Sequence, residues 1–316
     1  QQIVSVLAER FHLNLFQMYD WFWRHEDLIR READGSVAES WMDLFGRVNA
    51  WMTIRDLVAA IHREHGLAMA YVTIYAAREG YEQLSGVSPG WGLFETPQAE
   101  AQSALAFGGD RYLFLFDPSN AQWQMRMASE YIEAILEGGF DGVHIDQFGP
   151  RPTLYRVDGT PVELRDTFAP FLEVIDAALS AAVPDRDACI FNLVDGIVDG
   201  YAVEQVATSS ACDVLYSEIW FANDTYESLR AYIEQLRELG GGRPVVLAVY
   251  PQYGEDVGVI LEAESATLEG VEVASEVEDA SGGAYIAGFD AVGDGLEWSF
   301  DLSEDATVSF VFRYAN

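Results

Sequence analysis

The stretch FDGVHIDQFGP, residues 140–150, decides the fold because it has the pattern of a short buried strand that ends on a carboxylate. Alternation with period two puts Val143 and Ile145 on one face of this strand. His144 and Asp146 lie on the other face, and Asp146 is at the carboxyl end. Barrels of alternating strands and helices carry catalytic groups at that end. Asp146 is therefore a candidate catalytic acid, and a helix cap is the alternative interpretation.

Strand-like runs of this kind alternate with helical patterns through residues 1–255, and three of the helical patterns end in glycine. This alternation predicts an α/β fold with a parallel sheet. Seven strands predict a TIM-type (β/α)8 barrel that is cut short before its eighth strand, and an open doubly wound sheet is the alternative. The other six predicted strands are LNLFQMYDW (13–21), AMAYVTIYA (68–76), YLFLFDP (112–118), CIFNLV (189–194), VLYSEIW (214–220) and VVLAVY (245–250).

The pattern changes in residues 256–316, which have short alternating strands, glycine turns and no helical period. These features predict part of a β-sandwich module. Sixty residues are few for a complete sandwich, so we expect the chain to be a piece of a longer protein.

Acidic residues dominate the charge of the chain. There are 52 Asp and Glu against 18 basic residues, all of them Arg, which gives a net charge of −34. Such a surface repels itself unless concentrated salt screens it, so we expect a halophilic source. Nucleic acid and anionic membranes are poor partners for this surface, and no apolar run predicts a membrane span. The two cysteines, Cys189 and Cys212, fit no metal-binding spacing.

A second carboxylate, Glu218, occupies an equivalent place in VLYSEIW. It shares a strand face with Tyr216, ends its strand, and is followed by Trp220. Aromatic surroundings raise the pKa of a carboxyl group, as a general acid requires. We expect Asp146 to be the more solvated of the two acids. Glycosidic bond cleavage requires such a pair of carboxyl groups. Two unrelated acids at the edge of the core would give the same pattern.

Aromatic and polar residues near the predicted strand ends support a sugar site. Sugar rings stack on aromatic faces, and Asp, Asn or His side chains can bind the hydroxyl groups. The alternative is that several of these residues pack the top of the barrel. The candidates for substrate binding are Tyr19, Asp20, Trp21, His25, His144, Asn192, Tyr216 and Trp220, and Asn192 is also a candidate for orienting the nucleophile.

Five motifs together resemble glycoside hydrolase family 66 over residues 10–253: FQMYDWFWRHE, YLFLFDPSN, FDGVHIDQFG, DVLYSEIW and PVVLAVY. Members of this family are dextranases and cycloisomaltooligosaccharide glucanotransferases, which act on α-1,6-linked glucans with retention. The family places its nucleophile at the end of the fourth barrel strand and its acid/base at the end of the sixth. By the predicted strand count, these positions are Asp146 and Glu218. The resemblance implies double displacement on dextran without a catalytic cofactor.

The tail resembles a family 35 carbohydrate-binding module through EAES, SGGAYIAGF and FRYAN. Such modules hold a structural calcium ion, and the resemblance makes Glu262 and Glu264 candidate ligands. In the cyclising glucanotransferases a module of this kind is inserted after the seventh barrel strand, where it falls here. The polymeric substrate leads us to expect an extracellular enzyme.

Two other classes of function stay open at this point. A non-catalytic glucan-binding protein could retain the barrel without activity, although the presence of both Asp146 and Glu218 argues against it. A structural or surface-layer fragment would need only the acidic surface and the β-module. The first alternative predicts dextran binding without turnover, and the second predicts no binding.

Overall fold

The computed structural model describes residues 2–109, 111–194, 202–219, 225–249, 266–275, 285–291 and 293–297. The chain divides into two compact units, Gln1–Pro251 and Gln252–Asn316. The boundary predicted at residue 255 lies outside the described residues and stays a prediction.

A six-stranded parallel sheet forms the centre of the first unit, with the strand order β1-β4-β8-β11-β12-β13. This order follows the chain without reversal, whereas a doubly wound sheet changes direction at a switch point. The sheet therefore fits an incomplete TIM-type barrel. The strands are β1 (Leu15–Met18), β4 (Leu67–Thr73), β8 (Gly142–Asp146), β11 (Ala188–Asn192), β12 (Val214–Ile219) and β13 (Val245–Val249).

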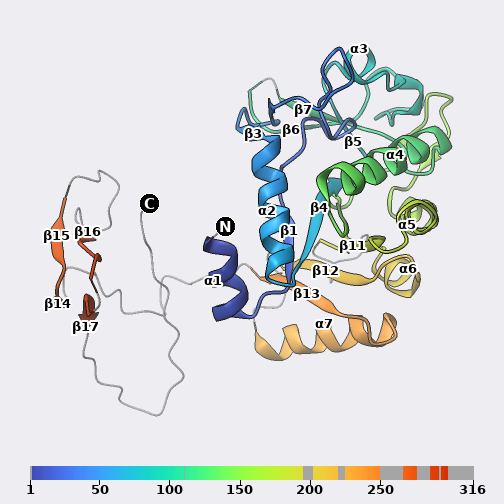
Figure 1. Ribbon diagram of the computed structural model, residues 1–316. Helices are drawn as coiled ribbons and strands as arrows, with labels where there is room; N and C mark the ends of the chain where they lie inside the picture. The colour runs from blue at the N-terminus through green and yellow to red at the C-terminus, as the bar shows by residue number, and fades with distance from the viewer. Residues whose placement is uncertain are drawn as a thin grey trace. The chain divides into compact units, whose positions relative to one another are not determined.

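Helices connect successive strands of this sheet, and Figure 1 shows them around its outer side. A further helix, α1, precedes β1 and contacts α2. The helices are α1 (Gln2–Phe11), α2 (Trp51–Arg63), α4 (Ala121–Gly138), α5 (Arg165–Ala182), α6 (Val203–Thr208) and α7 (Tyr226–Leu239). No helix in the described part of the chain is both long enough and apolar enough to cross a membrane.

Helix α4 shows how the sequence sets these connections. The Asn120 side chain caps its first turn by accepting hydrogen bonds from two backbone amides, and Gly139 ends it in the left-handed conformation. Residues spaced four apart, including Trp123 and Tyr131, put one apolar face in the core. Tyr131 Oη donates to the Thr73 carbonyl at 3.0 Å, which attaches the helix to β4.

One predicted barrel strand is wrong. The segment predicted over residues 112–118 forms β7 (Tyr112–Leu115), which pairs antiparallel with β5 (Ala76–Arg78) and β6 (Ala104–Ala106). A parallel neighbour needs a crossover of about a dozen residues or more, usually a helix. The segment between β4 and β7 supplies α3 (Tyr81–Ser85), a helix of only five residues. Consequently β4 pairs directly with β8.

The inserted elements gather at one end of the parallel sheet, where β4 leads into β5 (Figure 1). This is the carboxyl end of β4, the end where Asp146 also terminates β8. The inserted segments therefore lie at the same end of the sheet as the candidate acids. The remaining short elements of the first unit are β2 (Ser40–Met42), β3 (Val48–Ala50), the 3-10 helix η1 (Pro89–Trp91), β9 (Leu154–Tyr155) and β10 (Pro161–Val162).

Gly142 allows β8 and β11 to approach each other at the start of β8. A Cβ atom at this position would lie 2.0 Å from the Ala188 carbonyl oxygen, so any side chain would separate the two strands. Because β8 and β11 carry Asp146 and Asn192, this contact helps to fix the geometry of the candidate site.

The second unit contains two antiparallel pairs among its described residues. Strand β14 (Thr267–Glu269) pairs with β17 (Gly295–Glu297), and β15 (Glu272–Ala274) pairs with β16 (Tyr285–Ala287). The β-sandwich expected for residues 256–316 stays a prediction.

Candidate active site

Asp146 is the last residue of β8, and only 8% of it is exposed. Tyr71 Oη donates to its Oδ2 atom at 2.6 Å, and Asn192 Nδ2 donates to its Oδ1 atom at 2.6 Å. The two donors come from β4 and β11, the strands on either side of β8. Neutral donors on the flanking strands therefore hold both carboxylate oxygens.

The second hydrogen bond of Asn192 fixes the orientation of its amide. Its Oδ1 atom accepts from the Val194 amide at 2.7 Å. Because an amide oxygen can only accept, the NH2 group must point to Asp146. Asn192 therefore contacts Asp146 through its NH2 group, and its role in orienting a nucleophile stays a prediction.

Burial raises the pKa of Asp146 to about 6, and the negative charge of Glu218 adds to this effect. The hydrogen bonds from Tyr71 and Asn192 act in the opposite direction because they stabilise the ionised form. Asp146 was expected to be the more solvated acid, and the structure corrects this. The side chains of the two flanking strands cover the carboxylate of β8.

Glu218 lies near the carboxyl end of β12, and its backbone amide donates to the Val194 carbonyl at 3.0 Å. Glu218 lies on the same face of β12 as Tyr216, whose ring packs on His144 of β8, and its negative charge adds to the raised pKa of Asp146. In the described sheet, Asp146 ends the third strand and Glu218 stands in the fifth, not the fourth and sixth as counted from the sequence. Trp220, predicted to lie beside Glu218, falls outside the described residues.

His144 lies two residues before Asp146 on the same face of β8, and it is buried. Its ring centroid is 6.4 Å from that of Tyr71 and 4.6 Å from that of Tyr216. Burial lowers the pKa of His144 to about 3, so the ring is neutral. Its Nε2 atom has no hydrogen-bond partner among the described residues. His144 and Tyr216, both predicted to bind substrate, thus form an inner layer behind the two acids.

Tyr19 and Asp20 follow β1. Tyr19 is 62% exposed, and its ring centroid lies 4.2 Å from that of Tyr71. This exposure leaves part of the ring available for stacking on a sugar. Asp20 Oδ2 accepts from Arg47 Nη2 at 2.5 Å, so its carboxylate is already ion-paired.

A comparison with known families identifies the chain. The model of glycosyl hydrolase family 66 matches residues 1–291. The chain belongs to this family. The family expected from the sequence motifs is therefore confirmed.

The relatives of known function share one activity. Two cycloisomaltooligosaccharide glucanotransferases of Niallia circulans are 42% and 41% identical to the chain over 314 residues. Each alignment covers 99% of this chain and 32% of the relative. The chain thus spans about a third of the length of these family 66 relatives.

One solved structure agrees with this assignment, and another shares the fold. A cycloisomaltooligosaccharide glucanotransferase of Paenibacillus sp., complexed with cycloisomaltoheptaose, matches with a TM-score of 0.77 and 39% identity over 93% of this chain and 42% of that chain. A cycloalternan-forming enzyme of Listeria monocytogenes gives a TM-score of 0.51 at 13% identity over 80% of this chain and 24% of that chain. The second likeness shows the fold alone.

Two predicted substrate-binding residues of this family 66 chain lie in its core. Trp21 is 2% exposed; its Nε1 atom donates to the Tyr71 carbonyl at 3.0 Å, and its ring packs on Phe140. His25 is also buried, packs on Phe22, and has its pKa lowered to about 3 by burial. These positions suit residues that support the wall of the site, since neither ring has a face open for a sugar.

Sequence reasoning missed Tyr71, the donor to Asp146. Its strand is apolar on both faces, so alternation alone gave no reason to single it out. One signal was available in the period of two, which puts Tyr71 and Thr73 on the same face. That face turns toward Asp146, because Thr73 is the partner of Asp146 in the sheet register.

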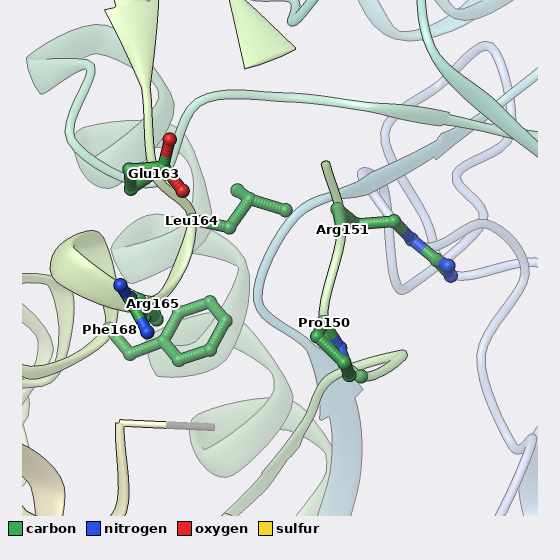
Figure 2. Close-up of a pocket in the computed structure, with 7 residues that line it drawn as sticks. Pro150, Arg151, Glu163, Leu164, Arg165 and Phe168 are labelled. Atoms are coloured by element: carbon green, nitrogen blue, oxygen red, sulfur yellow. The ribbon is translucent and has the colours of Figure 1, made fainter. Parts of the chain in front are cut away.

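A cavity of about 170 Å³ lies beside the loop that follows Asp146. Figure 2 shows Pro150 and Arg151 on one side of it and Leu164 and Phe168 on the other. Arg151 Nη2 donates to the Phe148 carbonyl at 3.1 Å, which ties the loop back on itself. The cavity therefore separates this loop from the start of α5.

Metal binding is the remaining part of the sequence interpretation. Within the described residues, no group of three or more His, Cys, Asp or Glu side chains is placed to hold a metal ion. Glu262 and Glu264, the candidate calcium ligands, fall outside those residues. Their role stays a prediction.

Proposed function

We propose that the enzyme containing this chain cleaves α-1,6-glucosidic bonds of dextran by double displacement with retention. The observation that carries the proposal is the pair of acids, Asp146 and Glu218, on inward faces of β8 and β12 near their carboxyl ends. The glucanotransferases that share 42% and 41% identity with the chain support the same substrate class.

In the first step, a carboxylate oxygen of Asp146 attacks the anomeric carbon of a glucosyl unit. Glu218 donates its proton to the departing glycosidic oxygen as the bond breaks, and a covalent glycosyl ester of Asp146 remains. This step requires an ionised Asp146 and a protonated Glu218 in the same enzyme molecule. The short hydrogen bonds from Tyr71 and Asn192 hold the attacking carboxylate in place.

In the second step, Glu218 accepts the proton of an incoming hydroxyl group, whose oxygen attacks the anomeric carbon and displaces Asp146. Water as the acceptor gives a linear product, and the 6-hydroxyl at the glucan's own non-reducing end gives a cyclic one. The names of the two curated relatives favour cyclisation.

The test uses the full-length enzyme with dextran in molar salt, with products resolved by mass. Cyclic products are lighter by one water than linear isomaltooligosaccharides, so mass separates transfer from hydrolysis. We expect Asp146→Asn to lose roughly 10⁴-fold or more of kcat/KM. Because Asp146 must be ionised and its pKa is about 6, wild-type activity should fall as the pH drops through this value.

Glu218→Gln provides a second check on the assigned roles. A leaving group that departs as a stable anion needs no proton, so this variant should retain the first step on an activated aryl α-glucoside and lose it on dextran. Asp146→Asn should lose both. A wild-type enzyme that releases nothing from any α-glucan would contradict the proposal.

We further propose that the second unit belongs to a calcium-holding carbohydrate-binding module and that the enzyme acts outside the cell on polymeric glucan. The proposal extends the tail motifs and the substrate class. Calcium chelation should lower the Tm of the wild type and leave Glu262→Gln/Glu264→Gln unaffected. A Tm of the wild type that does not respond to chelation would contradict the calcium role.

A further inference from the structure

The Tyr71 phenol contacts the carboxylate that the proposed mechanism uses as its nucleophile. We infer that Tyr71 is a positioning residue, whose hydroxyl holds Asp146 Oδ2 and stabilises the ionised carboxylate for attack. The inference rests on the proposed function, because it assigns a role relative to that nucleophile. It adds a second residue to Asn192, which holds the other oxygen.

The ring of Tyr71 is held on several sides. It stacks on Phe22, with centroids 6.0 Å apart and planes at 13°, and meets the edge of His144 at 6.4 Å. Tyr19 covers it at 4.2 Å. The backbone is fixed as well, because the Tyr71 carbonyl accepts from Trp21 Nε1 at 3.0 Å. The phenol therefore has little freedom to leave Asp146.

Tyr71 keeps its proton over the whole working range of pH. Burial raises the pKa of its phenol well above 10, and the negative charge of Asp146 raises it further. The hydroxyl is consequently a donor whenever the carboxylate is ionised. A hydrogen bond of this kind favours the charged form of the acceptor and lowers its pKa.

Neutral donors suit a nucleophile better than a cation would. No ion pair to Asp146 occurs in the described part of the chain. When Asp146 forms the glycosyl ester its negative charge disappears, and a buried cation would then be left without a partner. Tyr71 and Asn192 can keep their hydrogen bonds to the ester oxygens, so the clamp serves both states.

Several titratable groups surround Asp146, and their charges affect the pKa that a pH experiment measures. Glu218 raises the pKa of Asp146, and His144 is neutral at working pH. Among the described residues, the titratable groups on the sheet face of Asp146 or coupled to its charge are Tyr71 from β4, His144 from β8, Tyr216 and Glu218 from β12, and Tyr19 from the segment after β1.

The test compares the pH dependence of kcat/KM for the full-length wild type and Tyr71→Phe on dextran. Loss of the Tyr71 hydroxyl should raise the pH at which kcat/KM falls on the acidic side of the profile, the acidic limb, by about one pH unit. The plateau value of kcat should fall by about 10- to 100-fold because the carboxylate is less well aimed, while KM changes little. A merely structural role would leave the acidic limb in place.

Tyr131→Phe is the matched control. Tyr131 is also a buried tyrosine, and its hydroxyl donates to the Thr73 carbonyl of the same strand at 3.0 Å. Its loss removes a comparable hydrogen bond without touching Asp146. We expect a lower Tm and an acidic limb at the wild-type pH.

An activity-free readout separates failure of this inference from failure of the proposed function. Infrared difference spectra of the wild type against Asp146→Asn report the titration of the Asp146 carboxyl even in an inactive protein. Its midpoint, near 6 in the wild type, should rise in Tyr71→Phe. An unchanged midpoint would overturn the inference. A raised midpoint in an enzyme inactive on all α-glucans would support the contact and contradict the proposed function.

Discussion

Asp146 and Glu26 are both buried carboxylates, but their partners differ in charge. Glu26 is fully buried, and its Oε1 atom accepts from Arg24 Nε at 2.5 Å and from Ser85 Oγ at 2.9 Å. Its Oε2 atom accepts from the Arg78 amide at 3.0 Å. Asp146 accepts from two neutral side chains.

This difference separates a structural acid from a reactive one. Arg24 neutralises Glu26 and also donates to the carbonyls of Arg78, at the end of β5, and of Glu79, so the pair attaches the segment after β1 to the inserted elements. The chain has only 18 Arg for 52 acids, and one of them is buried beside Glu26. Asp146, buried without such a partner, has a raised pKa and remains available for attack.

The largest effect on stability is expected from Glu26→Gln. The variant leaves Arg24 buried without its carboxylate, which should lower the free energy of unfolding by about 3–5 kcal/mol. Chemical denaturation in molar salt measures this loss. The control is Glu234→Gln, which breaks the exposed Arg230–Glu234 pair and should hardly change the midpoint. Equal effects of the two variants would contradict the assignment of Glu26 as a structural acid.

Asp146→Asn should have the opposite sign and be somewhat smaller. A pKa raised from 3.8 to about 6 means that the folded state disfavours the ionised form, by about 3 kcal/mol at pH 8. The folded state is therefore most stable below about pH 4, where Asp146 is protonated in both states, and it loses this contribution to the free energy of unfolding as the pH rises through 6. The uncharged variant escapes the loss, and Tyr71 can reverse its hydroxyl to accept from the new amide.

Unfolding curves at pH 4 and pH 8 test this second prediction. Asp146→Asn should be more stable than the wild type by about 2–3 kcal/mol at pH 8 and equal to it at pH 4. A destabilised variant at pH 8 would show that Asp146 is a structural acid like Glu26.

Period and composition predicted most of the fold. Six of the seven predicted strands form the parallel sheet, because apolar runs between amphipathic helices leave few other arrangements. The segment that became β7 has the same apolar pattern, and only its pairing with β5 and β6 distinguishes it. Pairing depends on the length of the intervening helix, which the apolar pattern does not report.

The site was predictable only where a residue's own position carried the signal. Asp146 stood out because it ends its strand, and Asn192 because it stands near the end of another. Tyr71 lies 75 residues before Asp146, and their contact depends on the register of β4 against β8. Trp21 was misplaced for a related reason: composition cannot tell an aromatic face open to a sugar from one packed on Phe140.

Asn192→Asp is the smallest change and the sharpest test of the neutral clamp. The new carboxylate keeps the acceptor for the Val194 amide, so the backbone contact survives. It replaces the donor to Asp146 Oδ1 with a negative charge, and both effects raise the pKa of Asp146. The acidic limb of the kcat/KM profile on dextran should move up by about one pH unit or more. Asn120→Asp, which adds the same charge at the N-cap of α4 and keeps its acceptor role, should leave the limb in place. An acidic limb that does not move in Asn192→Asp would mean that the neutral donors around Asp146 do not control its ionisation. The difference between Asp146 and Glu26 would then depend only on Arg24, the partner of Glu26.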